Sequence, residues 1–256
     1  MNFLTLMQIG KIMITNPGVL AGDKKYIFLL SHMRSYSSLL SHILGSHDSI
    51  AGYSEMHLSY KKRSDLLTLR YRVYITNNRE PINDYIFDKI LHNHAIDTKI
   101  LNDRNTKALF MLREPEATLK SILKMSENMN NPNRISDINK IKNYYLKRLN
   151  QLEELAKITN GTAIYLDAEK IVNDTDFVLG YLTDWLQLKA PLSSEYKTFS
   201  KTGEPGFGDP SDNIKQGKII KNRKQPDVTI PDEILKTAQE KYNRCRETIM
   251  KHCTSI

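Results

Sequence analysis

The sequence predicts an α/β fold in which a central parallel β-sheet is flanked by helices. Two observations carry this prediction. Short segments that are continuously apolar, rather than alternately apolar and polar, recur along the chain, and an amphipathic helical pattern follows each of them. Strands that are buried on both faces have such continuous runs, and helices usually connect parallel strands. The 256 residues suit one domain, residues 1–256, with a core that needs no disulfide support.

Five segments rich in β-branched and aromatic residues are the predicted strands. They are residues 26–31 (YIFLLS), 49–54 (SIAGYS), 85–92 (YIFDKILH), 107–112 (KALFML) and 162–166 (TAIYL). A helix is expected after the first strand, with an apolar face formed by Leu39, Leu40, Ile43 and Leu44 and with Gly45 as its C-terminal stop.

Three further helices have recognisable signals. Pro115 stands where a first-turn proline belongs, directly after the fourth predicted strand. Asn173 or Asp174 is expected to cap a helix whose apolar face runs over residues 177–186. Residues 139–157 have the pattern of an amphipathic helix. The sequence beyond residue 200 is rich in glycine and proline, which predicts a long loop of the kind that often has a function.

Composition narrows the classes of function. The net charge of +8 is compatible with nucleic-acid binding, with a lysine-rich solvated surface, or with a pocket for one highly anionic small molecule. We expect no nucleic-acid partner, because the chain has no lysine–arginine block, zinc-finger spacing or aromatic RNA-binding motif. The two cysteines form neither a disulfide framework nor a metal cluster, which favours a reducing compartment. Residues 1–22 lack the pattern of a signal peptide or a membrane span, so we expect a cytoplasmic protein without stable membrane insertion.

Polar residues at the carboxyl ends of the predicted strands define the candidate site, because ligands of open parallel sheets bind there. These residues are 31–38 after the first strand, Glu55 and His57 after the second, 89–94 around the third, and Arg113 after the fourth.

The junction after the first strand, SHMRSYSS, has the layout of a phosphate-binding loop without its glycines or its Gly-Lys-Ser/Thr ending. A helix N-terminus offers unpaired N–H groups and a positive dipole, which accommodate a phosphate. Ser35, Ser37 and Ser38 add hydroxyl donors, and Arg34 adds a forked cation. The alternative is that one serine merely caps the helix.

The junction after the fourth strand, FMLREPEATLKS, places Ser121 about two helical turns beyond Arg113. The two side chains are therefore expected to meet only where another strand or loop brings a ligand across. The alternative is a surface arginine that pairs with Glu114 or Glu116.

The two junctions together, in this order, resemble the PAPS-dependent sulfotransferases of the bacterial and carbohydrate type, in which PAPS is 3′-phosphoadenosine 5′-phosphosulfate. SHMRSYSSLL resembles the 5′-phosphosulfate loop of that family, and REPEATLKS resembles its 3′-phosphate motif. IYLDAEKIVNDTDFVLGYLTDWLQL resembles a later strand–turn–helix segment, and GEPGFGDPSDNIKQGK resembles the loop that closes over the nucleotide. The resemblance implies a fold similar to that of the P-loop nucleotide hydrolases.

The resemblance also implies which residues hold the nucleotide. Those expected at the 5′-phosphosulfate are Arg34, Ser35, Tyr36, Ser37 and Ser38. Those expected at the 3′-phosphate are Arg113 and Ser121, and Tyr165 is expected to contact the nucleotide. Tyr36 stands at the usual glycine position. Either the loop backbone follows a different path there, or the ring lines the pocket.

Catalysis by in-line displacement is the activity that the resemblance implies. Glu55 matches the position of a carboxylate base, and Lys89 matches a strand lysine that approaches the transferring sulfuryl group. Arg34 and Lys89 would stabilise the charge that builds on the bridging oxygen. His57 and His92 compete with Glu55 for the role of the base.

The acceptor is expected to be a carbohydrate or another small-molecule alcohol, with residues 56–84 and 125–145 lining its site. No metal is expected, because a sulfuryl group carries less charge than a phosphoryl group and no acidic metal cluster is evident. The oligomeric state is left open. Two alternatives remain: a P-loop nucleotide kinase, which would require Gly-x-x-x-x-Gly-Lys-Ser/Thr and a magnesium-binding aspartate, and a non-catalytic nucleotide-binding protein of the same fold.

Overall fold

The computed structural model describes residues 22–77, 84–128, 137–204, 208–209, 211–221 and 226–256, together with isolated positions before residue 22. Its strands are β1 (Lys25–Leu30), β2 (Ile50–Ala51), β3 (Tyr85–Ile90), β4 (Thr106–Leu112), β5 (Ile164–Asp167) and β6 (Thr254–Ser255). Its helices are α3 (Ser37–Gly45), α4 (Ser64–Thr76), α5 (Thr98–Leu101), α6 (Pro115–Asn128), α7 (Ile138–Lys157), α8 (Lys170–Asn173), α9 (Thr175–Trp185) and α10 (Asp232–His252), with a 3₁₀ turn, η1 (Ile214–Gln216).

The predicted parallel sheet is confirmed. The strands lie in the order β2-β3-β1-β4-β5-β6, and every pairing between neighbours is parallel. Leu30 at the end of β1 pairs with Ile90 of β3 on one side and with Phe110 of β4 on the other. The carboxyl ends of these three strands therefore lie close together at one edge of the sheet, where ligands of open α/β sheets bind.

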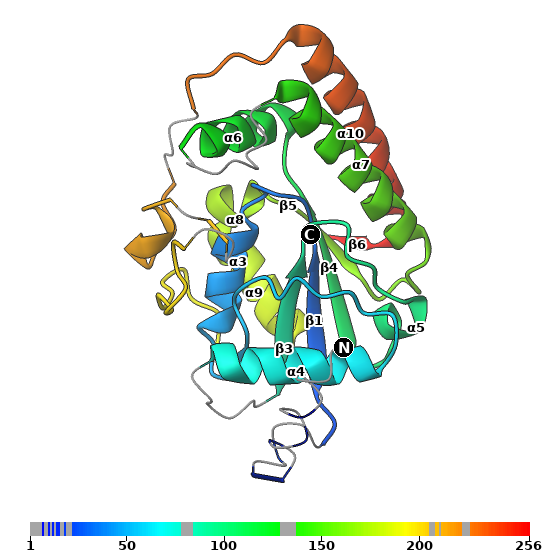
Figure 1. Ribbon diagram of the computed structural model, residues 1–256, viewed down its shortest axis with the longest axis vertical. Coiled ribbons are helices and arrows are strands. Elements are labelled where there is room, and N and C mark those ends of the chain that lie inside the picture. The colour runs from blue at the N-terminus through cyan, green and yellow to red at the C-terminus, as the bar shows by residue number, and fades with distance from the viewer. Residues whose placement is uncertain are drawn as a thin grey trace.

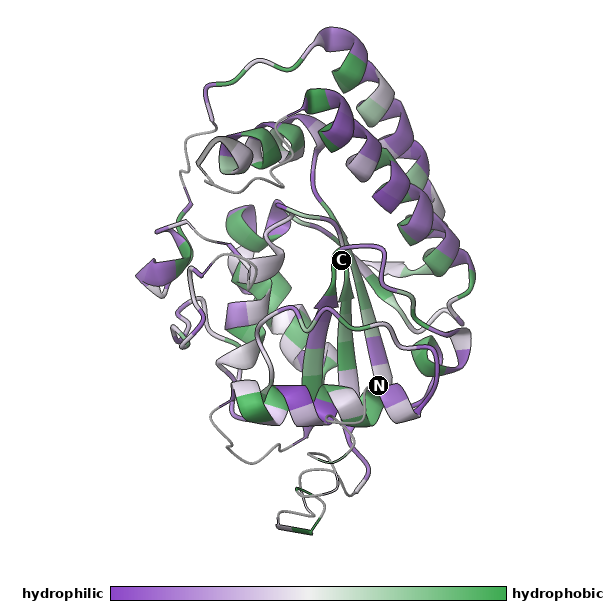
Figure 2. Cartoon of the chain, viewed as in Figure 1, coloured by the Kyte–Doolittle hydropathy of each residue, from purple (hydrophilic) through white to green (hydrophobic). Residues whose placement is uncertain are grey.

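Helices cover both faces of the sheet, as the continuously apolar strands predicted (Figure 1). Alternate residues of each strand face opposite sides. In β1, Phe28 and Leu30 pack in a core with residues of α4, α6, α7 and α10, and α7 and α10 run side by side. Ile27 and Leu29 pack in a second core with residues of α3, α8 and α9. Figure 2 shows the apolar colour concentrated on the strands and on the inner sides of the helices.

Some element predictions need correction. Gly45 is the last residue of α3 rather than a residue beyond it, and Ser46 is the cap. Asp174 stands at the cap of α9, but its side chain makes no capping hydrogen bond. Phe177, expected on the apolar face of that helix, is 52% exposed. β6 was not predicted, because it has only two residues and both are exposed.

A buried arginine of α7 donates hydrogen bonds to backbone carbonyls at the carboxyl ends of the strands. Arg148 donates from Nε to the carbonyl of Ser31 at 2.8 Å and from Nη1 to the carbonyl of His92 at 2.9 Å. Its Nη2 donates to the carbonyl of Ile90. Backbone acceptors at buried strand ends are costly when unpaired. Arg148 thus stabilises the strand ends from which the candidate site is built.

Among the described helices, none is long and apolar enough to span a lipid bilayer.

Candidate functional site

The loop after β1 adopts a backbone that glycine normally provides. Arg34 and Tyr36 both have φ near 62°, in the left-handed region. Side chains other than glycine are strained there, and the surrounding contacts must hold them in place. Ser35 between them donates from Oγ to the carbonyl of His32 at 2.7 Å, and its Oγ lies 2.6 Å from that of Ser31. The loop is therefore tight although it contains no glycine.

Tyr36 fixes the position of Arg113. The Arg113 guanidinium lies over the Tyr36 ring, 4.3 Å from its centroid, and Nη2 donates to the Tyr36 hydroxyl at 3.2 Å. A cation over an aromatic face is held by the ring quadrupole. Nη1 donates to the carbonyl of Arg34 at 2.8 Å. The carboxylate nearest to Arg113 is that of Glu169, with Nε and Oε1 3.7 Å apart, rather than Glu114 or Glu116.

Arg34 links the two predicted nucleotide motifs directly. Its Nε donates to the Ser121 hydroxyl at 2.8 Å, so Ser121 reaches the loop after β1 without a ligand between them. Its Nη1 pairs with Asp209 Oδ1 at 2.8 Å. Burial alone would raise the pKa of the Asp209 carboxyl, but the charge and hydrogen bond of Arg34 lower it below its ordinary value. Sequence reasoning missed Asp209, although it lies in the predicted functional loop.

That late loop packs against the start of α3. The backbone N–H of Asp209 donates to Ser38 Oγ at 2.9 Å. Gly208 has φ 146°, which strains any other residue, and a Cβ there would lie 2.9 Å from Ser38 Oγ and 3.2 Å from Lys89 Nζ, so a side chain would also displace these two groups. Residues 205–207 and 210 of this loop lie outside the described residues.

Lys89 reaches the same place from β3. Its side chain is buried, and Nζ donates to Ser38 Oγ at 3.1 Å. Burial lowers the pKa of the Lys89 ammonium, although the nearby carboxylates of Glu55, Asp88 and Asp209 oppose that shift. An ammonium group therefore lies beside the Ser38 hydroxyl of α3, and it comes from β3 because the loop after β1 has no lysine of its own.

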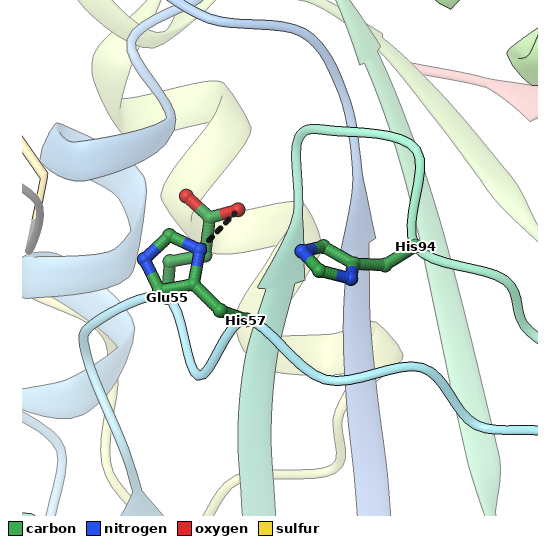
Figure 3. A group of neighbouring side chains, drawn as sticks. All are labelled: Glu55, His57 and His94. Atoms are coloured by element: carbon green, nitrogen blue, oxygen red, sulfur yellow. Dashed lines mark ion pairs between the residues drawn. The ribbon is translucent and has the colours of Figure 1, made fainter. Parts of the chain in front are cut away.

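The candidate bases form one cluster. Glu55 is buried, and its Oε1 lies 3.5 Å from His57 Nδ1 and 4.0 Å from His92 Nε2. Burial lowers the pKa of His92 despite the opposing charge of Glu55. His94, from the loop after β3, completes the cluster (Figure 3). His94 lies within the polar stretch 89–94 that the sequence singled out, but it was not among the predicted candidates for the base.

Asp88 positions the segment that carries Glu55. Its Oδ1 accepts from the backbone N–H groups of Met56 and Lys89, each at 2.9 Å, and its Oδ2 accepts from the Tyr60 hydroxyl. Burial raises the pKa of Asp88 from 3.8 to about 7, although these hydrogen bonds act in the opposite direction.

Asp88 therefore makes stability pH-dependent. Between about pH 4 and pH 7 the folded protein holds a proton that the unfolded chain has released, so the free energy of unfolding should fall as pH rises through this window. Asp88→Asn keeps an acceptor for the two N–H groups and does not titrate. We expect its melting temperature to vary less with pH than that of the wild type, whereas Asp84→Asn, at an exposed position before β3, should behave like the wild type. Parallel curves for all three proteins would contradict this role of Asp88.

Tyr165 lies away from the other predicted site residues. It is 1% exposed and belongs to the core between the sheet and α10. Its hydroxyl donates to Asp167, which also pairs with Arg246 of α10. Its position in the middle of β5, rather than at the strand end, explains why it does not face the site.

The segments expected to line the acceptor site are described only in part, because residues 78–83 and 129–136 lie outside the described residues. Among the described residues of the second segment, Tyr144 of α7 reaches the cluster. Its ring centroid lies 5.7 Å from that of His92, and its hydroxyl donates to the carbonyl of Leu91.

Two solved structures share this architecture. A sulfotransferase domain from the curacin biosynthetic pathway matches with a TM-score of 0.57 and 17% identity, over 87% of this chain and 99% of that one. A sulfotransferase domain from the Synechococcus PCC 7002 olefin synthase matches with a TM-score of 0.56 and 15% identity, over 88% of this chain and 97% of that one. The chain has the sulfotransferase fold. No protein-family model and no curated protein matches the sequence.

Within this sulfotransferase fold, four loops meet at the carboxyl edge of the sheet. They bring together a strained loop that leads into the serines of α3, two linked arginines and a buried glutamate beside histidines, and the buried Lys89 of β3 lies next to them. At these sequence identities the likeness establishes the fold, and the activity has to be argued from the site.

Proposed function

We propose that this protein transfers a sulfuryl group from PAPS to the hydroxyl group of a carbohydrate or another small-molecule alcohol. One observation carries the proposal. Arg34 contacts Ser121, and Arg113 contacts the Arg34 carbonyl, each at 2.8 Å. The motifs assigned to the two anionic ends of one nucleotide are thus joined in a single network. PAPS carries anionic groups at both its 3′ and 5′ positions, and such a molecule matches two linked arginines with their serine donors.

The nucleotide would lie across the loop after β1. Ser35, Ser37 and Ser38 and the N-terminus of α3 would hold the 5′-phosphosulfate together with Arg34. Arg113 and Ser121 would hold the 3′-phosphate. Tyr36 acts through its ring, which orients the guanidinium of Arg113. Tyr165 has no part in this proposal.

The reaction would be an in-line displacement at sulfur. Glu55 removes the proton of the acceptor hydroxyl, the acceptor oxygen bonds to sulfur, and the bond from sulfur to the bridging oxygen breaks as adenosine 3′,5′-bisphosphate leaves. Lys89 and Arg34 stabilise the negative charge on that bridging oxygen. Asp209 balances Arg34 in this structure, so an incoming phosphosulfate competes with that carboxylate for the guanidinium.

A panel of sugars and aliphatic alcohols incubated with radiolabelled PAPS tests the activity directly. We expect label to move to at least one hydroxyl-bearing acceptor, with formation of adenosine 3′,5′-bisphosphate. Binding of that nucleotide without any transfer would instead support the non-catalytic alternative. Transfer of phosphate from Mg-ATP would support the kinase alternative, for which the loop lacks the Gly-Lys-Ser/Thr ending.

A further inference from the structure

A glutamate, which is the proposed catalytic base, and two histidines converge on one point from two loops. Glu55 and His57 follow β2, and His94 follows β3. One ligand atom from each, a carboxylate oxygen or an imidazole nitrogen, lies within 4.8 Å of the others. In Figure 3 the His94 ring points across the gap toward His57 and Glu55. This grouping has no motif in the sequence, because β3 separates the two loops.

The buried carboxylate oxygen of this cluster lacks a hydrogen bond. Glu55 is 6% exposed, and no described group donates a hydrogen bond to its Oε1. His57 Nδ1 lies 3.5 Å away, which is too long for a good hydrogen bond. It matches the roughly 3.3–3.5 Å between two ligands of one tetrahedral ion with bonds of about 2.0–2.2 Å. Burying an acceptor without a partner is costly, and a cation would remove that cost.

We propose that Glu55, His57 and His94 bind a divalent ion of the zinc class. Two imidazoles and one carboxylate are a three-ligand set that leaves a fourth tetrahedral position open to water or to an acceptor oxygen. The His57 side chain is 47% exposed and His94 is half-buried, so both rings can rotate to close the remaining distance. Mg²⁺ is excluded as the preferred ion because it requires oxygen ligands.

Two nearby cations limit the affinity of this site. Lys89 and Arg148 both interact electrostatically with Glu55, and both disfavour a dication beside that carboxylate. We therefore expect micromolar rather than nanomolar binding of Zn²⁺.

Occupancy of this site would block sulfuryl transfer, a consequence that rests on the proposed function. A carboxylate oxygen bound to the ion no longer takes the proton of an acceptor hydroxyl. The ion would therefore compete with catalysis at Glu55, and removal of the ion with a chelator would restore turnover.

Calorimetric titration of the 256-residue chain with Zn²⁺ tests the binding, and the visible spectrum of Co²⁺ reports the coordination. We expect one ion per chain with tetrahedral Co²⁺ bands, no heat with Mg²⁺, and a loss of affinity of at least about tenfold in His94→Ala. His94→Gln, with its melting curve, shows whether any loss reflects misfolding. His252→Ala, a histidine at the end of α10, is the matched control and should bind as the wild type does. Equal binding in wild type and His94→Ala, or no binding at all, would overturn the site.

A second measurement separates this proposal from the proposed function. Binding of Zn²⁺ is measured without PAPS, so it stands even if no transfer is detected. Where transfer is detected, Zn²⁺ should inhibit it reversibly, and His94→Ala should need a higher Zn²⁺ concentration for the same inhibition. Binding of Zn²⁺ at this cluster with unchanged transfer would refute the inhibitory consequence.

Discussion

Arg113→Ala is expected to lower the affinity for adenosine 3′,5′-bisphosphate by about 100-fold or more and to remove the preference for that nucleotide over 5′-AMP. A hydrogen bond to a charged group contributes about 1.5–3 kcal/mol, and about 1.4 kcal/mol corresponds to a factor of ten in affinity. A guanidinium that contacts a phosphate through two such bonds therefore accounts for a loss of this size. Calorimetric titration with both nucleotides measures it.

The control for this prediction has to separate phosphate recognition from support of the loop, because Arg113 also holds the Arg34 carbonyl and the Tyr36 ring. Arg104→Ala removes an exposed arginine just before β4 and should change neither affinity. If Arg113 recognises the 3′-phosphate, Arg113→Ala should weaken binding of adenosine 3′,5′-bisphosphate and leave binding of 5′-AMP unchanged. An equal loss for both nucleotides would show that Arg113 supports the loop and does not recognise the 3′-phosphate.

Glu55→Gln is expected to lower kcat for sulfuryl transfer by about 10²- to 10⁴-fold, the usual contribution of a positioned general base. Glutamine has nearly the same shape but does not accept the proton of the acceptor. Binding of adenosine 3′,5′-bisphosphate should stay at the wild-type level, because Glu55 makes no contact in the network of Arg34, Ser121 and Arg113. Steady-state kinetics with a metal chelator present measures the effect free of bound ions, and Glu195→Gln, at an exposed position, is the matched control.

The histidines beside Glu55 are the alternative candidates for the base, and their variants provide the result that would contradict this prediction. His92 Nε2 lies 4.0 Å from Glu55 Oε1, so either group is placed to face the same acceptor hydroxyl. If Glu55 is the base, His92→Ala should cost much less than Glu55→Gln. A large loss of kcat in His92→Ala or His57→Ala, with near-normal turnover in Glu55→Gln, would transfer the role of the base to a histidine.

The sheet and its two layers of helices could be predicted from the sequence because strands buried on both faces are continuously apolar. β1 shows this plainly, since all its residues after Lys25 are buried. β2 and β6 have two residues each, which is too few for any periodicity to be visible. Phe177 was predicted to be buried, yet its side chain is exposed. The spacing of apolar residues shows which side of a helix faces the core, but it does not show how much of that side other elements cover.

The site could be predicted only where chemistry coincides with a strand end. Arg34, Lys89 and Arg113 were found in this way, because each lies at or near the end of a strand that the sequence makes evident. Asp209 and Arg148 were missed because their partners are far away in the chain: 175 residues separate Asp209 from Arg34, and 117 separate Arg148 from Ser31. A pattern of neighbouring residues in the sequence cannot predict such distant pairs, because the two partners come together only in the folded chain.

The conformation of Tyr36 could not be predicted from a loop that contains no glycine. The absence of glycine left two possibilities, a different backbone path or a ring that lines the pocket, and in the structure Arg34 and Tyr36 themselves adopt left-handed conformations. The strain is held by contacts that use both residues: the Tyr36 ring lies under Arg113, and Arg34 is bonded to Ser121 and Asp209. The loop therefore reaches a glycine-like shape and gains an arginine-orienting ring.

Thermal denaturation with three nucleotides tests the central claim most directly. A ligand present at about 100 times its Kd adds about 2.7 kcal/mol to the free energy of unfolding, which corresponds to roughly 5–10 °C for a domain of this size. We predict a shift of this size with adenosine 3′,5′-bisphosphate and a much smaller one with 5′-AMP or Mg-ATP at the same concentration. Equal shifts with all three nucleotides, or a larger shift with Mg-ATP, would contradict recognition of a 3′-phosphate and with it the proposed sulfotransferase.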